Sequence, residues 1–83
     1  MHDGIPFQER MRWRIASRIR DGILPRRGPD EVLTGRGDGG TCDGCGERIT
    51  RVDAQVEATF VDCTLLHFHR SCYMQWNARR GQL

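Results

Sequence analysis

The sequence Thr-Cys-Asp-Gly-Cys-Gly at residues 41–46 contains two cysteines separated by two residues. The glycines inside and after the pair permit a tight turn that points the sulfurs of Cys42 and Cys45 at one ion. Further along the chain, His69 and Cys72 are three positions apart, so on the first turn of a helix their side chains face the same way. The four residues follow the pattern Cys-x2-Cys-x23-His-x2-Cys, which predicts a closed Cys3His site for one Zn²⁺.

Other roles are open to these residues and their neighbours. A Cys-x2-Cys pair can be a redox centre, but such a pair usually lies between a strand and a helix. Here the pair lies between a Gly-rich segment and a predicted strand. His67 could replace His69 as a ligand, although a place on the surface of a strand suits it better. Cys63 has no second cysteine close by, which favours a small packing residue or a spare thiol.

The chain has 83 residues, of which 37% are hydrophobic and ten are glycine. A single domain of this size buries apolar surface inefficiently, and glycines raise the entropy that folding must overcome. Such chains usually need a disulfide, a metal or a partner for stability. The first fourteen residues contain no apolar signal-like run, so we expect a cytoplasmic location. In a reducing compartment, clustered cysteines bind metal more often than they form disulfides.

Residues 41–83 are predicted to form a small α+β module in which a knuckle precedes a β-hairpin and a helix. Residues 51–61 alternate between apolar and polar side chains, as a half-buried strand does. Residues 62–64 can turn the chain, and residues 65–68 can return as a second strand. From His69 onward the residues suit a helix that stops near the C-terminus.

The order of knuckle, hairpin and helix, with the second ligand pair at the start of the helix, resembles the treble-clef zinc finger. The spacing of the four ligands is also similar to the first half of a LIM domain, in which CxxC is followed at a comparable distance by HxxC. The resemblance covers residues 41–80 and implies a zinc-stabilised fold. It implies no particular function, because the same architecture carries many functions.

Residues 1–24 are predicted to form an Arg-rich amphipathic helix. Pro6 suits its first turn, and Gly22 suits its end. Apolar side chains recur every four residues and form a stripe that would face the rest of the domain. The stripe consists of Phe7, Met11, Ile15 and Ile19.

Residues 25–40 are punctuated by Gly and Pro, which predicts a Gly-rich loop or linker with room for one short turn. This segment contains the triplet Arg36-Gly37-Asp38. The triplet resembles an adhesion motif, but chance explains it better in a chain expected inside the cell.

The charge of the chain is unevenly distributed. Residues 1–27 carry +4, residues 28–41 carry −2, and the charges of residues 42–83 balance. One Zn²⁺ with three thiolates and an imidazole has a net charge of −1, so the finger itself is a poor polyanion binder. Contacts to nucleic acid are therefore expected in the first helix, at Arg10, Arg12, Arg14, Arg18 and Arg20. A docked helix with a solvated Arg face is the simpler alternative.

Together these features predict a small, non-enzymatic zinc-binding protein, a binding or regulatory module with nucleic acid slightly favoured as its partner. The alternative is a protein–protein interaction adaptor with a purely structural zinc, in which the apolar stripe and Trp13 form the interface. A fully ligated zinc offers substrate no open position, which argues against an enzyme. No segment is long and apolar enough to span a membrane, so no membrane partner is expected. All 13 basic residues are Arg, which favours a bacterial source.

Overall fold

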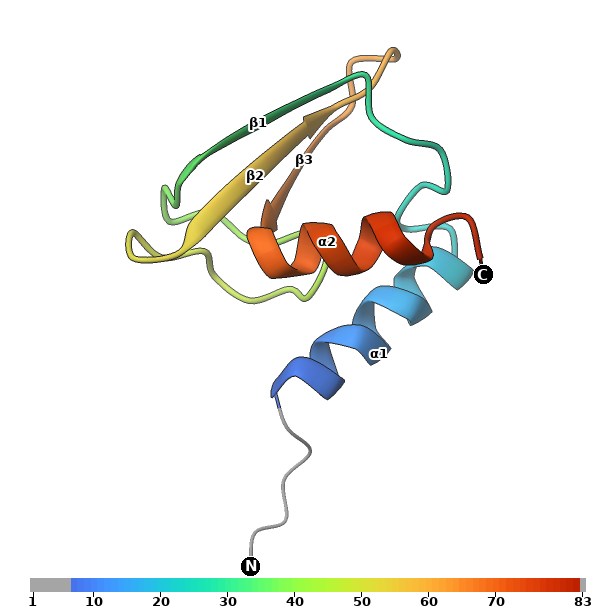
Figure 1. Ribbon diagram of the computed structural model, residues 1–83, viewed down its shortest axis with the longest axis horizontal. Coiled ribbons are helices and arrows are strands. Elements are labelled where there is room, and N and C mark those ends of the chain that lie inside the picture. The colour runs from blue at the N-terminus through green and yellow to red at the C-terminus, as the bar shows by residue number, and fades with distance from the viewer. Residues whose placement is uncertain (1–6, 83) are drawn as a thin grey trace, which may run out of the picture.

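The computed structural model describes residues 7–82, with side chains from Glu9 onward. The elements follow one another as α1 (Phe7–Arg20), β1 (Glu31–Arg36), β2 (Ala54–Thr59), β3 (Leu65–His69) and α2 (Arg70–Arg79). The strands form one antiparallel sheet in the order β1-β2-β3. Figure 1 shows α2 between this sheet and α1, and α2 contacts both α1 and the strands β2 and β3. The chain is therefore a small α+β fold, as predicted.

The helix α1 turns its apolar stripe toward the interior. Met11, Ile15 and Ile19 are each at most 2% exposed, because positions four apart lie on one face of a helix. Two residues beyond the end of α1, Gly22 has a φ of +80°, a left-handed conformation that glycine adopts readily. The predicted role of Pro6 and the side chain of Phe7 lie outside the described residues.

Neither described helix is long and apolar enough to cross a membrane. The helix α1 has 14 residues and α2 has ten, whereas a spanning helix needs about 20 apolar residues.

The hairpin of β2 and β3 alternates as the sequence predicts. Val56, Ala58 and Phe60 are at most 2% exposed, since every second residue of a strand points to the same face. The two strands join through a tight turn in which the N–H group of Phe60 donates a 2.9 Å hydrogen bond to the carbonyl of Thr64. This hairpin supplies the sheet face on which α2 packs.

The segment predicted to be a loop or linker, residues 25–40, contains the strand β1, and this corrects the sequence prediction. All six residues of β1 are exposed, so no alternating apolar pattern marks them as a strand. The strand forms because its backbone pairs with β2 over its whole length, from Glu31 opposite Thr59 to Arg36 opposite Ala54. The conformation of this edge strand depends on its distant partner more than on its own residues.

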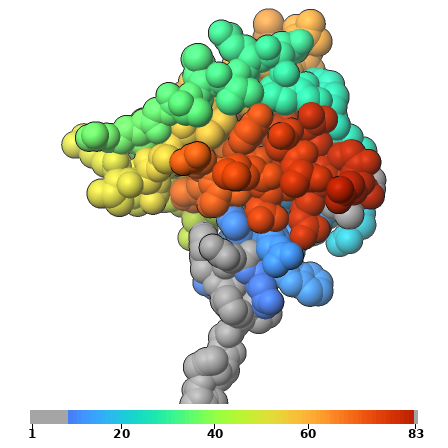
Figure 2. Space-filling model, viewed as in Figure 1, coloured from blue at the N-terminus to red at the C-terminus, as the bar shows by residue number. Residues whose placement is uncertain are grey.

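Aromatic side chains fill the space between the sheet and α2. Trp76 is fully buried and stacks on Phe68 with ring centroids 5.2 Å apart, and its ring meets Phe60 in an edge-on contact at 6.1 Å. Its indole N–H donates a 2.9 Å hydrogen bond to the carbonyl of Pro25, which satisfies the buried polar group. In Figure 2, α2 (orange to red) lies below β1 (green), and α1 (blue) lies beneath α2.

Candidate metal centre

A tight turn at residues 42–46 presents the first two sulfurs. The N–H group of Gly46 donates a 2.9 Å hydrogen bond to the carbonyl of Cys42, and the N–H group of Cys42 donates to the carbonyl of Glu47, also over 2.9 Å. Gly46 has a φ of +83°, which a residue with a side chain rarely adopts. These bonds close the turn while the side chains of Cys42 and Cys45 remain buried.

Gly44, inside this turn, lies directly against the core. A Cβ atom at this position would lie 3.2 Å from the Cβ of Cys72, 3.2 Å from the ring of Phe68 and 3.4 Å from the side chain of Ile15. These neighbours belong to α2, β3 and α1. The absent side chain therefore lets the knuckle pack closely on three elements at once.

The other two residues of the group come from the junction of β3 and α2. His69 is the last residue of β3 and the N-cap of α2, with an extended backbone (φ −60°, ψ 149°), and it pairs with Gln55. Cys72 lies in the first turn of α2. The sequence prediction placed both residues on the first helical turn, which is wrong for His69 because sheet pairing keeps it extended.

The four side chains nevertheless converge. Their ligand atoms all lie within 4.8 Å of one another. The Nδ1 atom of His69 lies 3.5 Å from the sulfur of Cys45 and 3.7 Å from the sulfur of Cys72. In a tetrahedral site with bonds of about 2.3 Å to sulfur and about 2.0 Å to nitrogen, sulfur and nitrogen are about 3.5 Å apart. The group, Cys42, Cys45, His69 and Cys72, is therefore compatible with binding one metal ion and consistent with zinc.

Backbone N–H groups surround the sulfurs. Those of Cys45 and His69 approach the sulfur of Cys42 at 3.5 and 3.4 Å, and that of Glu47 approaches the sulfur of Cys45 at 3.4 Å. Such donors stabilise the thiolate form of cysteine, which is the form that binds metal.

The imidazole of His69 is oriented by groups on its far side. Its Nε2 atom lies 3.1 Å from the carbonyl of Arg48 and 3.7 Å from a carboxylate oxygen of Asp53. If Nε2 carries the proton, Nδ1 has its lone pair free for the metal, as histidine ligands in zinc sites require. Sequence reasoning missed Arg48 and Asp53, since no spacing rule links them to His69.

Without a metal, the three thiols compete for ionisation. The pKa of Cys42 is lowered to about 4, chiefly by the hydrogen bond from the thiol of Cys72 and further by backbone N–H groups. The same hydrogen bond raises the pKa of Cys72 far above its ordinary value, and burial raises the pKa of Cys45. Three thiolates so close together would repel one another. One bound divalent cation would offset this repulsion and allow all three sulfurs to ionise.

Comparisons of the chain with protein-family models, with curated proteins and with solved structures found no match. The treble-clef and LIM-like assignments therefore stay predictions. The structure shows a knuckle, a hairpin and a helix whose Cys and His side chains cluster at one point.

Two sequence candidates lie outside this cluster. The Nε2 atom of His67 is 3.3 Å from a carboxylate oxygen of Glu57 and does not take part in the Cys3His group. Cys63 is exposed in the β2–β3 turn with a φ of +71°. The alternative that Cys63 packs in the core is wrong, because a turn residue at this position points to solvent.

The five arginines of α1 fall into two sets. Arg14 donates hydrogen bonds to the carbonyl of Cys45 at 2.6 Å and to the carboxylate of Glu47 at 2.9 Å, and Arg18 donates to the carbonyl of Asp43 at 3.1 Å. These two side chains hold α1 against the knuckle. The second set, Arg10, Arg12 and Arg20, is exposed along α1.

Proposed function

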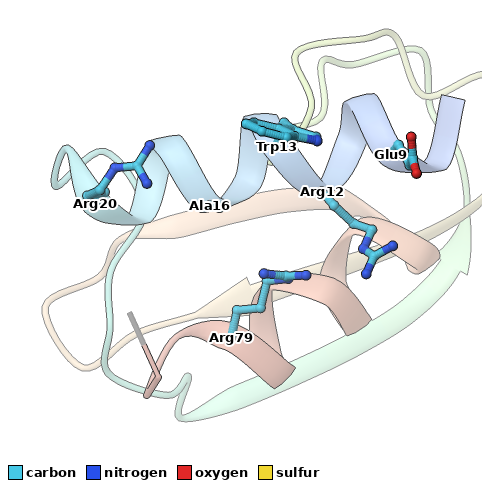
Figure 3. A pocket seen from close by; sticks show the side chains of 6 residues that line it. All are labelled: Glu9, Arg12, Trp13, Ala16, Arg20 and Arg79. Carbon is cyan, nitrogen blue, oxygen red and sulfur yellow. The ribbon is translucent and has the colours of Figure 1, made fainter. Parts of the chain in front are cut away.

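We propose that this chain is a zinc-stabilised module that binds single-stranded nucleic acid across the junction of α1 and α2. An open pocket of about 380 Å³ lies at this junction. Its lining consists of Glu9, Arg12, Trp13, Ala16, Arg20 and Arg79. Figure 3 shows Arg12 extending from α1 toward α2 and Arg79 extending from α2 toward α1. The observation that carries the proposal is the approach of these two guanidinium groups across the junction, in a pocket that the exposed indole of Trp13 also lines.

The chemistry of the pocket suits a phosphate backbone with unstacked bases. None of its three arginines forms an ion pair within the described part of the chain, so their charges remain available to an anion. Guanidinium groups bind phosphate oxygens in pairs of hydrogen bonds. Trp13 is 73% exposed, and an exposed aromatic ring beside basic residues is the usual platform on which a base of a single strand stacks.

In this proposal the metal is one Zn²⁺ with a structural role, held in a treble-clef-like finger. Three sulfurs and an imidazole nitrogen complete a tetrahedral set, and soft thiolates favour zinc over calcium or magnesium. A site with four protein ligands has no position left for substrate, which supports a binding protein rather than an enzyme.

The finger also places the proposed binding helix. Arg14 and Arg18 connect α1 to the carbonyls of the knuckle, and the knuckle is the part of the chain that the metal would hold in shape. Loss of zinc is therefore expected to weaken nucleic-acid binding, even though no ligand of the metal lines the pocket.

The test is a titration of the zinc-loaded protein with single-stranded DNA and RNA at several salt concentrations. Each arginine that neutralises a phosphate of a single strand contributes about 0.7 to the magnitude of the log–log salt slope. Changing Arg12, Arg20 and Arg79 together to Gln is expected to lower that magnitude by up to about two. Trp13→Ala is expected to weaken binding with little change in the salt slope, because a base that stacks on the ring involves no neutralised phosphate.

A matched control changes Arg36, Arg51 and Arg70 to Gln. All three residues are exposed, and their substitution removes the same charge from β1, from the turn before β2 and from the start of α2. The control is expected to bind nearly as well as the wild type. Equal losses in the two triple variants would mean that only net charge matters, and the proposed site would be wrong. Absence of salt-dependent binding at about 50 mM salt would remove nucleic acid as the partner.

A protein partner is the second candidate, because Trp13 and Ile23 expose apolar surface at 73% and 62% and line one further pocket together. Aromatic residues are enriched at the centres of protein interfaces. If the nucleic-acid titration fails, the double variant Trp13→Ser with Ile23→Ser tests the adaptor. Loss of self-association, or of binding to a purified protein partner, in this variant would favour the adaptor.

A further inference from the structure

The two edges of the described sheet differ, because one is covered and the other is open. On the outer side of β3, the N–H group of His67 donates a 2.8 Å hydrogen bond to a carboxylate oxygen of Asp43. The carbonyl of His67 accepts a 2.7 Å hydrogen bond from the N–H group of Asp43, so the knuckle covers this edge. Figure 1 shows β1 at the opposite rim of the sheet, and all six of its residues are exposed.

Alternate residues of β1 direct their backbone groups away from the sheet. Directly after the strand, the N–H group of Gly37 donates a 2.9 Å hydrogen bond to the carbonyl of Asp53. Hydrogen-bonded pairs alternate along an antiparallel ladder, so every second residue back from Gly37 turns its N–H and C=O groups toward β2. The residues between them turn theirs outward, and these are Val32, Thr34 and Arg36. Among the described residues, none of these outward N–H groups forms a hydrogen bond outside the sheet.

We propose that this edge is a self-association surface on which β1 of a second copy of the chain pairs antiparallel, with Leu33 of each copy beside the two-fold axis. In this register Val32 stands opposite Thr34 of the second copy. Both residues have outward N–H and C=O groups, which can exchange hydrogen bonds as in any antiparallel pair. The same surface then serves both copies, as two-fold symmetry requires, and the two sheets become one continuous sheet.

Charge favours this register over its neighbours. Asp30 of the second copy stands opposite Arg36, and the symmetry repeats the pair at the other end of the strand. Both residues are exposed, and neither forms an ion pair within the described part of the chain. A shift of two residues would place Arg36 opposite Val32 instead. A shift of one residue would place the outward groups of one strand opposite groups that already bond to β2 in the other.

The occupant is a second copy rather than a foreign peptide, because the edge complements itself. Exposed edges are commonly protected by proline or by charges along the strand, whereas β1 has no proline and no charge between Glu31 and Arg36. Leu33 is 55% exposed and would contact its own counterpart in a non-hydrogen-bonded pair, where opposite side chains are closest. Pairing stops at two chains because the knuckle covers the other edge of the sheet.

The dimer is expected to be weak and independent of the proposed nucleic-acid site. One pair of short strands buries less than the roughly 1,000 Å² of a stable interface, so we expect a dissociation constant on the order of 10⁻⁴ M. No residue of β1 lines the pocket between α1 and α2. Failure of the dimer would therefore leave the nucleic-acid proposal unchanged, and the reverse also holds.

The experiment measures self-association of the zinc-loaded, full-length chain by sedimentation velocity, at concentrations from about 10 µM to about 1 mM. We expect an equilibrium between monomer and dimer. Over the same range, hydrogen exchange of the outward amides of Val32 and Thr34 is expected to slow, because the dimer bonds them. The amide of Val52, which is 92% exposed and outside β1, is the control. A chain that stays monomeric, or a dimer that leaves both amides unprotected, overturns the proposal.

Two charge variants test the register. Arg36→Asp and Asp30→Arg each place like charges opposite each other at both ends of the pairing, and each is expected to raise the dissociation constant about tenfold or more. An equimolar mixture of the two variants restores an acid opposite a base at both ends, so the mixture is expected to dimerise. Arg51→Asp makes the same charge change at an exposed residue outside β1 and is expected to dimerise as the wild type does. A mixture that does not associate, or an equal loss in Arg51→Asp, overturns the register.

Two further variants separate the edge from the apolar surface of α1. Thr34→Pro removes one outward N–H group, at a place where an edge strand accepts proline because the group does not bond to its neighbour. This variant is expected to lose dimerisation while its zinc content stays at that of the wild type. The double variant Trp13→Ser with Ile23→Ser is expected to dimerise normally. If the double variant alone loses self-association, the interface lies on α1 and the proposal is wrong.

Discussion

Arg14 of α1 donates a 2.6 Å hydrogen bond to the carbonyl oxygen of Cys45, 31 positions further along the chain. The same guanidinium pairs with Glu47 at 2.9 Å. The basic helix and the metal-binding turn are therefore connected directly. An arginine that the sequence assigns to a nucleic-acid partner is thus engaged within the fold.

Removing this connection is expected to lower stability. Arg14→Gln and Arg18→Gln should each reduce the free energy of unfolding of the zinc-loaded protein by about 1 kcal/mol, a usual value for a hydrogen bond from a charged group that is partly exposed. The control is Arg12→Gln, which breaks no hydrogen bond to the knuckle and should stay within about 0.5 kcal/mol of the wild type. Urea denaturation at constant zinc concentration measures the difference. Equal effects of the three substitutions would contradict the structural role of Arg14 and Arg18.

Loss of the metal is expected to unfold the finger. Cys42→Ser, Cys45→Ser and Cys72→Ser should each abolish tight binding of one zinc, and a strong chelator should have the same effect on the wild type, because the binding free energy of a structural zinc is folding free energy. Cys63→Ser is the matched control, since this thiol is exposed and outside the cluster. Native mass spectrometry reports the zinc content, and near-UV circular dichroism reports the packing of Trp76. A wild-type chain that stays folded in chelator without metal would refute the structural role.

Acidification is expected to release the metal. In the metal-free chain the pKa of Cys42 is lowered to about 4, whereas those of Cys45 and Cys72 are raised. At neutral pH Cys42 is then ionised and the other two thiols are protonated, so zinc binding displaces about two thiol protons. The logarithm of the apparent zinc affinity should rise by about two per pH unit between about pH 7 and pH 8, and more steeply in acid, where further ligands must also lose a proton before they bind zinc. Chelator competition at a series of pH values measures this slope. A slope near zero would mean that the thiolates are not ligands.

Alanine substitutions at two glycines of the same segment are expected to differ sharply in their effect on stability. A Cβ atom on Gly37 would overlap the carbonyl oxygen of Thr50 and lie 2.8 Å from the side chain of Ile49. Gly37→Ala should therefore destabilise the protein by about 2 kcal/mol or more. Gly35→Ala meets nothing within 4 Å and should change stability by no more than about 1 kcal/mol. Thermal denaturation of the zinc-loaded variants compares them. Similar midpoints would show that the chain at Gly37 can move aside.

The Gly37 contact also explains the Arg36-Gly37-Asp38 triplet without an adhesion role. Glycine is required at the middle position because the backbone carbonyl of Thr50 occupies the space that a Cβ atom would need. The carboxylate of Asp38 lies within 4.8 Å of the side-chain ligand atoms of Glu57 and His67.

Much of the local structure could be predicted from the sequence. The apolar stripe of α1 and the alternation of β2 follow from helix and strand periodicity, which depends only on near neighbours. The metal group could also be predicted, because few side chains bind zinc and a tight turn restricts their spacing. Met11, Val56 and Cys42 are buried as these rules require.

Other features depend on contacts between distant residues, which no local pattern records. The strand β1 has no apolar alternation, and it forms only because its backbone groups pair with those of β2. His69 is extended because Gln55 pairs with it, although the residues that follow it suit a helix.

The roles of the arginines likewise depend on how α1 packs. Five arginines on one helix look alike in the sequence. The close approach of Gly44 to Ile15 places the knuckle beside one face of α1, so Arg14 and Arg18 meet its carbonyls while Arg12 lies beside α2. Periodicity and ligand chemistry specify the elements and the metal group because both act over a few residues. Only the tertiary packing decides which charges are paired, because a hydrogen bond requires two groups in contact whatever their separation along the chain.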